Sequence, residues 1–170
     1  MSRKTILAAL VLAMFGMTAC DDEETTGPGN TQDEIVGTWV SAGADVAPGL
    51  AGAPFNTDSI IATFNDDNTY VVDSYSGTTV VNFTGTYQIG PQAEGQIRAI
   101  TLNQSTPTSL TSEGIFQVSG SGATMQYEVI QTSPALQGFT APTVAGGFGS
   151  TAFNGTPLGA TWIQNYDRRN

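Results

Sequence analysis

Few side chains in this chain can carry out covalent or metal chemistry. Among its 170 residues there is no histidine and a single cysteine, Cys20. Histidine is the commonest general base and the commonest metal ligand in proteins. Without it the chain cannot form a Ser-His-Asp triad, a Cys-His pair or an ordinary zinc site. The residue types therefore predict a protein that is not an enzyme and that uses no metal or other cofactor.

Carboxylates are the remaining reactive groups, and some enzymes use only carboxylates. Asp58, Asp73, Glu113 and Glu128 are scattered along the sequence and form no evident pair. The run Asp66-Asp67-Asn68 could suggest a calcium loop, but calcium loops space their acidic ligands and end in a distal glutamate. We interpret this run as a turn.

Cys20 follows a segment that is typical of export. Arg3 and Lys4 precede an apolar run, residues 6–17, and small residues follow it. This is the order of a secretory signal peptide, and the run is shorter than the roughly 20 apolar residues that cross a bilayer. Met17-Thr18-Ala19-Cys20 resembles the bacterial lipobox, in which the cysteine becomes the lipidated first residue of the mature protein. The alternative is an ordinary signal peptide with a chance cysteine.

This interpretation divides the chain into three parts: a signal peptide at 1–19, Cys20 with an acidic tether at 20–33, and a folded domain at 34–170. The tether is rich in Gly, Pro, Thr and acidic residues and cannot bury apolar surface. A lipid on Cys20 would attach the protein to a membrane of the bacterial cell envelope. The acidic run at 21–24 resembles surface-export signals of Bacteroidota lipoproteins, although an aspartate there retains lipoproteins at the inner membrane in enterobacteria. We expect the outer membrane or the cell surface.

The charge balance excludes one class of partner. Removal of residues 1–19 leaves three basic residues against 15 acidic ones, a net charge of −12. Such a chain cannot neutralise a row of phosphates, so nucleic acid is not an expected partner. Attraction to an anionic lipid surface is disfavoured for the same reason. With one cysteine there is also no intramolecular disulfide, and stability must come from packing.

The domain has the alternating pattern of half-buried β-strands. In residues 80–89, Val81, Phe83, Tyr87 and Ile89 share one face with Gly85, and polar residues occupy the other face. No stretch keeps a helical apolar period. We predict eight strands, at 35–42, 58–65, 69–76, 79–89, 96–103, 113–119, 123–132 and 159–167.

The lengths of the connections favour a barrel. In an up-and-down sheet, alternate connections lie at the same end. Short turns at 66–68, 90–95 and 120–122 would lie at one end. The other end would carry 77–78 and the longer loops at 43–57, 104–112 and 133–158. We therefore predict an all-β fold, an eight-stranded antiparallel up-and-down barrel with one end closed by short turns. The alternative is a β-sandwich.

Several motifs are similar to those of lipocalins. Gly37-Thr38-Trp39 resembles the Gly-x-Trp signature of the first lipocalin strand. Residues 62–70 and 84–87 resemble the next strands of lipocalin-like (calycin-type) domains found in lipoproteins of Bacteroidota and related bacteria. The resemblance covers about residues 34–167, and it implies a calycin-type barrel.

The resemblance also implies roles for particular residues. The family's tryptophan packs across the closed end against an arginine just past the last strand, which here corresponds to Trp39 and Arg168, with Arg169 as the alternative. Together with Gly37, Trp39 and Arg168 would form the structural closed end of the barrel. A loop at 43–57 would fold over the mouth. The chain departs from ordinary lipocalins in its missing disulfide, its missing helix after the barrel and its long 133–158 loop.

The barrel interior provides the candidate ligand site. Seven large residues are expected to face inward: Phe64, Tyr70, Phe83, Tyr87, Phe116, Met125 and Tyr127. Either they fill the barrel completely, or they line a cavity for a small hydrophobic or amphipathic ligand, with tyrosine hydroxyls to orient it.

The 133–158 loop combines Gly, Ala and Pro with apolar residues such as Phe139, Phe148 and Phe153. It could pack over the barrel end as a lid, or present a patch for a protein partner or lipid. Two functions are therefore expected from the sequence. One is a lipid-anchored barrel that binds a small ligand outside the cytoplasm. The other is a surface-exposed interaction protein with a filled barrel that contacts a partner through its long loops.

Overall fold

The computed structural model describes residues 33–91 and 96–169. By its contacts the chain divides after Thr31, and the second unit, Gln32–Asn170, contains the whole fold described below. The predicted signal peptide, Cys20 and the tether up to residue 32 lie outside the described residues.

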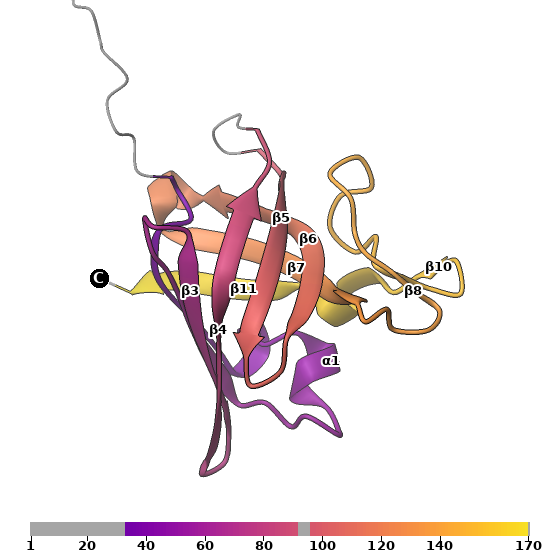
Figure 1. Cartoon of the computed structure of the whole chain (residues 1–170), viewed down its shortest axis with the longest axis horizontal. Coiled ribbons are helices and arrows are strands. Elements are labelled where there is room, and N and C mark those ends of the chain that lie inside the picture. Colours follow the sequence, from indigo (N-terminus) through magenta and orange to yellow (C-terminus); the bar gives the residue numbers. More distant parts are fainter. Residues whose placement is uncertain (1–32, 92–95, 170) are drawn as a thin grey trace, which may run out of the picture. The chain divides into compact units, whose positions relative to one another are not determined.

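Eight strands close into one antiparallel barrel (Figure 1). Each strand pairs with its neighbour in sequence, and the last strand closes the ring between the seventh and the first. The strands are β1 (Gly37–Ala42), β2 (Ser59–Phe64), β3 (Thr69–Ser76), β4 (Thr79–Ile89), β5 (Arg98–Thr106), β6 (Leu110–Ser119), β7 (Thr124–Ser133) and β11 (Gln164–Arg169). The predicted all-β up-and-down barrel is confirmed, and the alternative of a β-sandwich is wrong because the ring has no open edge.

The period-two pattern produces the barrel because it gives each strand one apolar face. In β2, Ile60, Ala62 and Phe64 are buried and the residues between them are half-exposed. All eight strands contribute buried residues to one core cluster. A side chain is excluded at Gly85, where a Cβ would collide with the backbone of β5 beside a register shift in which Ser105 of β5 is the extra residue. Such a bulge bends a strand, which helps a sheet to close.

Two strands are longer than predicted. The sequence suggests a loop at 104–112, but β5 continues to Thr106 and β6 begins at Leu110, so only a short turn remains. These strand ends consist mostly of Ser, Thr and Gln, and their side chains are partly or fully exposed. A strand that extends beyond the core keeps its hydrogen bonds but loses the apolar alternation that reveals strands in a sequence. The expectation of three long loops at this end is therefore wrong for 104–112.

The last strand is shorter than predicted. Residues 159–167 were expected to form it, but Gly159–Trp162 form a 3-10 turn, η3, and the strand begins at Gln164. Gly159 has a φ of 57°, which favours glycine and is incompatible with a regular strand.

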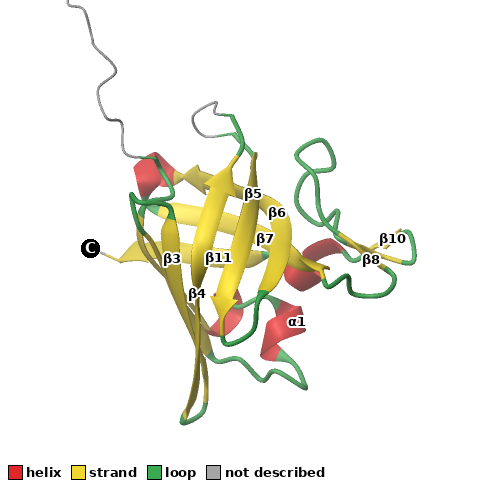
Figure 2. Cartoon of the chain, viewed as in Figure 1, coloured by secondary structure: helices red, strands yellow, loops and turns green. Residues whose placement is uncertain are grey.

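Short helical segments lie in the connections, as Figure 2 shows. They are η1 (Gly43–Asp45), α1 (Pro48–Ala51), η2 (Gly120–Gly122) and η3. The segment after β7, expected to be irregular, contains a small three-stranded sheet of β8 (Phe139–Thr140), β9 (Ala152–Phe153) and β10 (Thr156–Pro157). We call residues 134–163 the excursion. In Figure 1 the excursion extends to one side of β6 and β7.

Candidate functional site

The end of the barrel with the short turns is sealed by Trp39. Its side chain is fully buried, and Nε1 donates a hydrogen bond to the Ile35 carbonyl at 2.7 Å. The Arg168 guanidinium lies over the indole, with Cζ 4.1 Å from the ring centroid. Arg168 also donates to the carbonyls of Gly122, Val36 and Glu34. Of the two candidate arginines, Arg168 therefore takes the stacked position, and a cation–π contact of this kind contributes about 0.5–2 kcal/mol.

Gly37 belongs to the same arrangement for a steric reason. Its φ is 138°, which side chains rarely adopt, and a Cβ there would collide with Nη1 of Arg168. The spacing of the Gly-x-Trp motif thus has a physical basis. The tryptophan provides the ring, and the glycine leaves room for the guanidinium that stacks on it.

Sequence reasoning missed a second arginine at this end. Arg98 is buried inside the barrel, where Nη1 contacts Asp33 Oδ2 at 2.9 Å and Glu34 Oε1 at 3.7 Å. Its Cζ lies 5.3 Å from the centroid of the Phe116 ring, and Nη2 donates to the Gly90 carbonyl. Position 98 has the same parity as Ile100 and Leu102, so the alternation alone could have placed it on the inner face.

The other half of the interior contains a cavity of about 310 Å³. Its walls are mainly apolar and come from β2 to β7 and from β11, together with the segment that holds α1. Phe55 both lines the cavity and is 53% exposed, so the cavity reaches the surface beside it. Ligand pockets in proteins typically measure about 300–1,000 Å³. The size therefore suits one small ligand.

Four of the seven residues proposed from the sequence line this cavity: Phe64, Tyr70, Phe83 and Tyr127. The other three, Tyr87, Phe116 and Met125, do not line it. They are buried in the core cluster, where Phe116 packs under Arg98 and the Tyr87 hydroxyl donates to the Asn65 carbonyl at 2.7 Å. The barrel is thus filled at one end and hollow at the other, which neither of the two sequence alternatives described fully.

Tyr166 on β11 is a cavity residue that the sequence did not single out. Its ring meets that of Tyr127 edge-on, with centroids 6.1 Å apart. The predicted strand at 159–167 contained Tyr166, but the inward-facing candidates were taken only from the earlier strands. The alternation of Tyr166 with Gln164 and Arg168 would have indicated the inner face.

Burial raises the pKa of the phenols around the cavity. Desolvation raises the pKa of Tyr70 to about 12 and raises that of Tyr166 further. Tyr127 has a pKa well above its ordinary value, first because of desolvation and then because the Tyr166 and Tyr70 hydroxyls lie near it. All three phenols are therefore neutral at physiological pH and can donate hydrogen bonds.

The loop predicted to cover the mouth does line the cavity. Leu50, Phe55 and Thr57, from α1 and the residues after it, contribute to the wall. The loop is held at its start by Gln164, whose side-chain oxygen accepts a hydrogen bond from the Ala47 amide at 3.0 Å and whose amide nitrogen donates to Ser41. These side chains lie in positions that the sequence pattern did not reveal, because a loop has no period.

The excursion packs against the outside of the barrel wall. Glu128 faces away from the core, is fully buried, and accepts hydrogen bonds from the amides of Gly149 at 2.6 Å and Thr151 at 3.0 Å. Ile115 and Ile130 are buried on the same outer face of β6 and β7. No excursion residue is among those that line the cavity. The expectation that the 133–158 loop forms a lid over the barrel end is therefore wrong.

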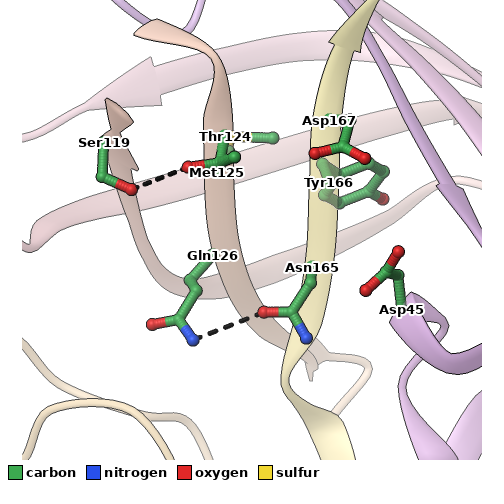
Figure 3. Close-up of a pocket in the computed structure, with 8 residues that line it drawn as sticks. All are labelled: Asp45, Ser119, Thr124, Met125, Gln126, Asn165, Tyr166 and Asp167. Carbon is green, nitrogen blue, oxygen red and sulfur yellow. Dashed lines mark hydrogen bonds between the residues drawn. The ribbon is translucent and has the colours of Figure 1, made fainter. Parts of the chain in front are cut away.

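A second hollow lies on the outer surface of β7 and β11 (Figure 3). Its volume is about 300 Å³. Its polar side chains bond to each other: Ser119 to Thr124 at 2.8 Å, and Gln126 to Asn165 at 3.3 Å. The two carboxylates of Asp45 and Asp167 complete the rim. Within residues 33–91 and 96–169, no group of three or more His, Cys, Asp or Glu side chains could hold a metal ion.

Comparison with known proteins found no match among family models, curated proteins or solved structures. In the described part of the chain, no helix has the length and apolar character needed to cross a membrane. The cavity and its phenols are thus the features on which a function can be argued.

Proposed function

We propose that this protein is a lipid-anchored, lipocalin-like lipoprotein of the bacterial cell envelope whose barrel binds one small hydrophobic or amphipathic molecule. The observation that carries the binding proposal is the apolar cavity of about 310 Å³, which reaches the surface beside Phe55. Binding would bury apolar ligand surface at roughly 25 cal/mol per Å². Catalysis is not part of the proposal.

Anchoring is proposed from the lipobox-like motif that ends at Cys20. Asp33, the last residue of the expected tether, binds Arg98 at the sealed end of the barrel. A lipid on Cys20 would therefore be connected to the end that is remote from the cavity mouth. Such an attachment leaves the mouth free for ligand exchange.

Lipidation is tested by replacing Cys20 with serine in the full chain, expressed in a bacterium that processes lipoproteins. The unmodified chain is expected to incorporate labelled palmitate and to sediment with membranes, and the C20S chain is expected to do neither. If the C20S chain still incorporates the label, the anchor lies elsewhere. For the unmodified chain, digestion by protease added to intact cells would distinguish a location on the cell surface from one on the periplasmic side.

Ligand binding is tested with residues 32–170, the compact unit that contains the barrel and its core. Decanol is expected to raise the melting temperature, because a ligand that binds only the folded state stabilises it. Replacing Val72, which lines the cavity, with tryptophan should abolish the shift. The matched control is Val71→Trp, on the opposite face of the same strand. Equal shifts in both variants would show that decanol binds outside the cavity.

A second candidate function is a protein contact through the excursion. Leu136, Val144 and Phe153 are 39%, 47% and 43% exposed. Exposed apolar side chains in one segment are a common feature of interaction sites. Alanine substitution of all three would abolish capture of a partner by the full chain while leaving decanol binding unchanged.

A further inference from the structure

Three phenols surround one part of the cavity. Phe64 lies between two of them, with its ring centroid 6.4 Å from that of Tyr70 and 6.4 Å from that of Tyr127. Tyr166 contacts Tyr127 from the other side. The three tyrosines come from β3, β7 and β11, so only the closed barrel brings them together.

These tyrosines are largely buried as residues, but their hydroxyl oxygens are not among the enclosed side-chain atoms that lack a hydrogen-bond partner in the described part of the chain, because the residues border the cavity. Tyr70, Tyr127 and Tyr166 are 4%, 9% and 6% exposed, and all three line the cavity. By contrast, the Tyr87 hydroxyl, buried in the filled end, donates to a carbonyl. A hydroxyl that borders an open cavity can bond to whatever occupies it, either water or the polar group of a ligand. The three phenols therefore offer hydrogen-bond donors to a molecule in the cavity.

The rest of the lining determines which ligands suit the site. The other polar side chains are the uncharged Thr57, Ser74, Gln104 and Ser112. No charged side chain is among the residues that line the cavity. Arg98 also lies inside the barrel, but it contacts Asp33 and Glu34 and does not line the cavity. An anionic ligand would therefore lose its hydration without gaining a counter-charge, which is costly.

We propose that the cavity selects uncharged amphipathic molecules, and that the hydroxyls of Tyr70, Tyr127 and Tyr166 donate hydrogen bonds to an acceptor oxygen at the polar end of the ligand. The chemical class includes ketones, esters and alcohols with a short apolar chain, and it excludes ionised fatty acids. This inference rests on the proposed function. It adds a selectivity that an apolar cavity alone does not have, since apolar walls discriminate weakly between end groups.

The test compares three ligands of equal chain length on residues 32–170: methyl octyl ketone, decane and decanoate. Affinities are measured by calorimetry at neutral pH. The ketone is expected to bind about tenfold more tightly than decane, the effect of roughly one good hydrogen bond to a buried donor. Decanoate is expected to bind at least about tenfold more weakly than the ketone. The triple variant Y70F/Y127F/Y166F keeps the rings, removes the hydroxyls, and should make ketone and decane bind equally.

Tyr75→Phe is the matched control, because it makes the same chemical change on β3 at a residue that does not line the cavity. It should leave the preference for the ketone unchanged. If ketone and decane bind the unmodified protein with equal affinity, the proposed selectivity is wrong, although the cavity still binds ligands. If decanoate binds most tightly of the three, the proposed selectivity is also wrong. Failure of all three ligands to bind would overturn the proposed function itself, and with it this inference. These ligand comparisons need no variant, so they remain decisive if the triple variant does not fold.

Discussion

The two ends of this barrel use similar residues for different purposes. At the sealed end the polar groups inside the barrel bond to the protein: Arg168 to three carbonyls, Trp39 and Tyr87 to one each, and Arg98 to a carboxylate and a carbonyl. Among the described residues at this end, only Arg98 Nε and Glu34 Oε1 are buried without a hydrogen bond, and Glu34 Oε1 still lies 3.7 Å from Arg98 Nη1. At the mouth, three tyrosines that are equally buried as residues line a cavity, and their hydroxyls can bond to its contents.

This difference in hydrogen bonding shows that one end of the barrel contributes to stability and the other to the capacity to bind a ligand. A buried polar group with a partner makes a modest net contribution to stability, whereas one without a partner reduces stability. The sealed end therefore supports the fold, and the mouth retains hydrogen-bonding capacity that folding does not use. Ligand sites are commonly less stable than they could be for this reason.

Among single substitutions, the largest effect is expected from Trp39→Ala at the sealed end. Trp39 is fully buried beneath Arg168, so its removal leaves a cavity and an unpaired guanidinium face. The free energy of unfolding, measured with urea, should fall by about 3–5 kcal/mol. The control is Val80→Ala, which is 50% exposed and should change stability by less than about 0.5 kcal/mol. A loss below about 1 kcal/mol for Trp39→Ala would contradict a structural role for the sealed end.

Arg98→Met tests whether the sealed end depends on its buried ion pair. Removing one partner of a fully buried pair costs about 3–5 kcal/mol. Asp33 and Glu34 are 21% and 15% exposed, so a loss of about 2–3 kcal/mol is expected. Adding Asp33→Asn should recover part of this loss, because it removes the carboxylate that lost its partner. If the double variant is no more stable than the single one, the contacts of Arg98 with Gly90 and Phe116 account for the effect instead.

The dependence of stability on alkaline pH compares the pKa values of the phenols at the mouth with those of the same phenols in the unfolded chain. The pKa of Tyr70 is raised to about 12, above the ordinary value of 10.0, and those of Tyr127 and Tyr166 are raised as well. Between pH 10 and 12 the unfolded chain therefore loses phenol protons that the folded barrel keeps. These phenols therefore contribute no pH dependence below pH 10, and above it stability should fall by up to about 1.4 kcal/mol per pH unit for each such phenol.

The same titration of Y70F/Y127F/Y166F should show a smaller alkaline loss. Tyr75→Phe again serves as the control. If the triple variant and the unmodified protein lose stability in parallel, groups other than these phenols dominate the alkaline unfolding, and the picture of a neutral phenol cluster is wrong.

The smallest effect is expected from Phe55→Ala at the mouth. Phe55 is 53% exposed, so the melting temperature should change little. Because Phe55 lines the opening of the cavity, bound methyl octyl ketone should dissociate about threefold faster, and exchange broadening in NMR spectra measures this rate. Val144→Ala, on the excursion, should leave the rate unchanged. An equal acceleration in both variants would mean that the excursion also covers the ligand.

Particular residues show how far the sequence could predict the site. Phe64, Tyr70, Phe83 and Tyr127 were identified as inward-facing cavity residues because each lies in a strand with apolar alternation. Leu50 and Phe55 were not, since their loop has no period, and Tyr166 was not, although the predicted strand at 159–167 contained it. For the 133–158 loop the sequence left two alternatives, a lid over the barrel end or a patch for a partner. The structure places this segment on the outside of the barrel wall, where Glu128 binds it. The alternation along β7 indicates that Glu128 points outward, but its partners, Gly149 and Thr151, lie more than 20 residues away in the sequence.

The sequence alone determined the strands, their inner faces and the chemical character of the interior. These properties are local, because the alternation of side chains along a strand has a period of two residues. The tertiary structure decided which inner residues fill the barrel and which leave a cavity. Tyr87 and Tyr70 share the inner face, yet Tyr87 bonds to a carbonyl at the sealed end, and Tyr70 lies in the cavity with Tyr166, 96 residues later in the chain. Whether a buried hydroxyl has a partner depends on such distant contacts, and only the closed barrel determines them.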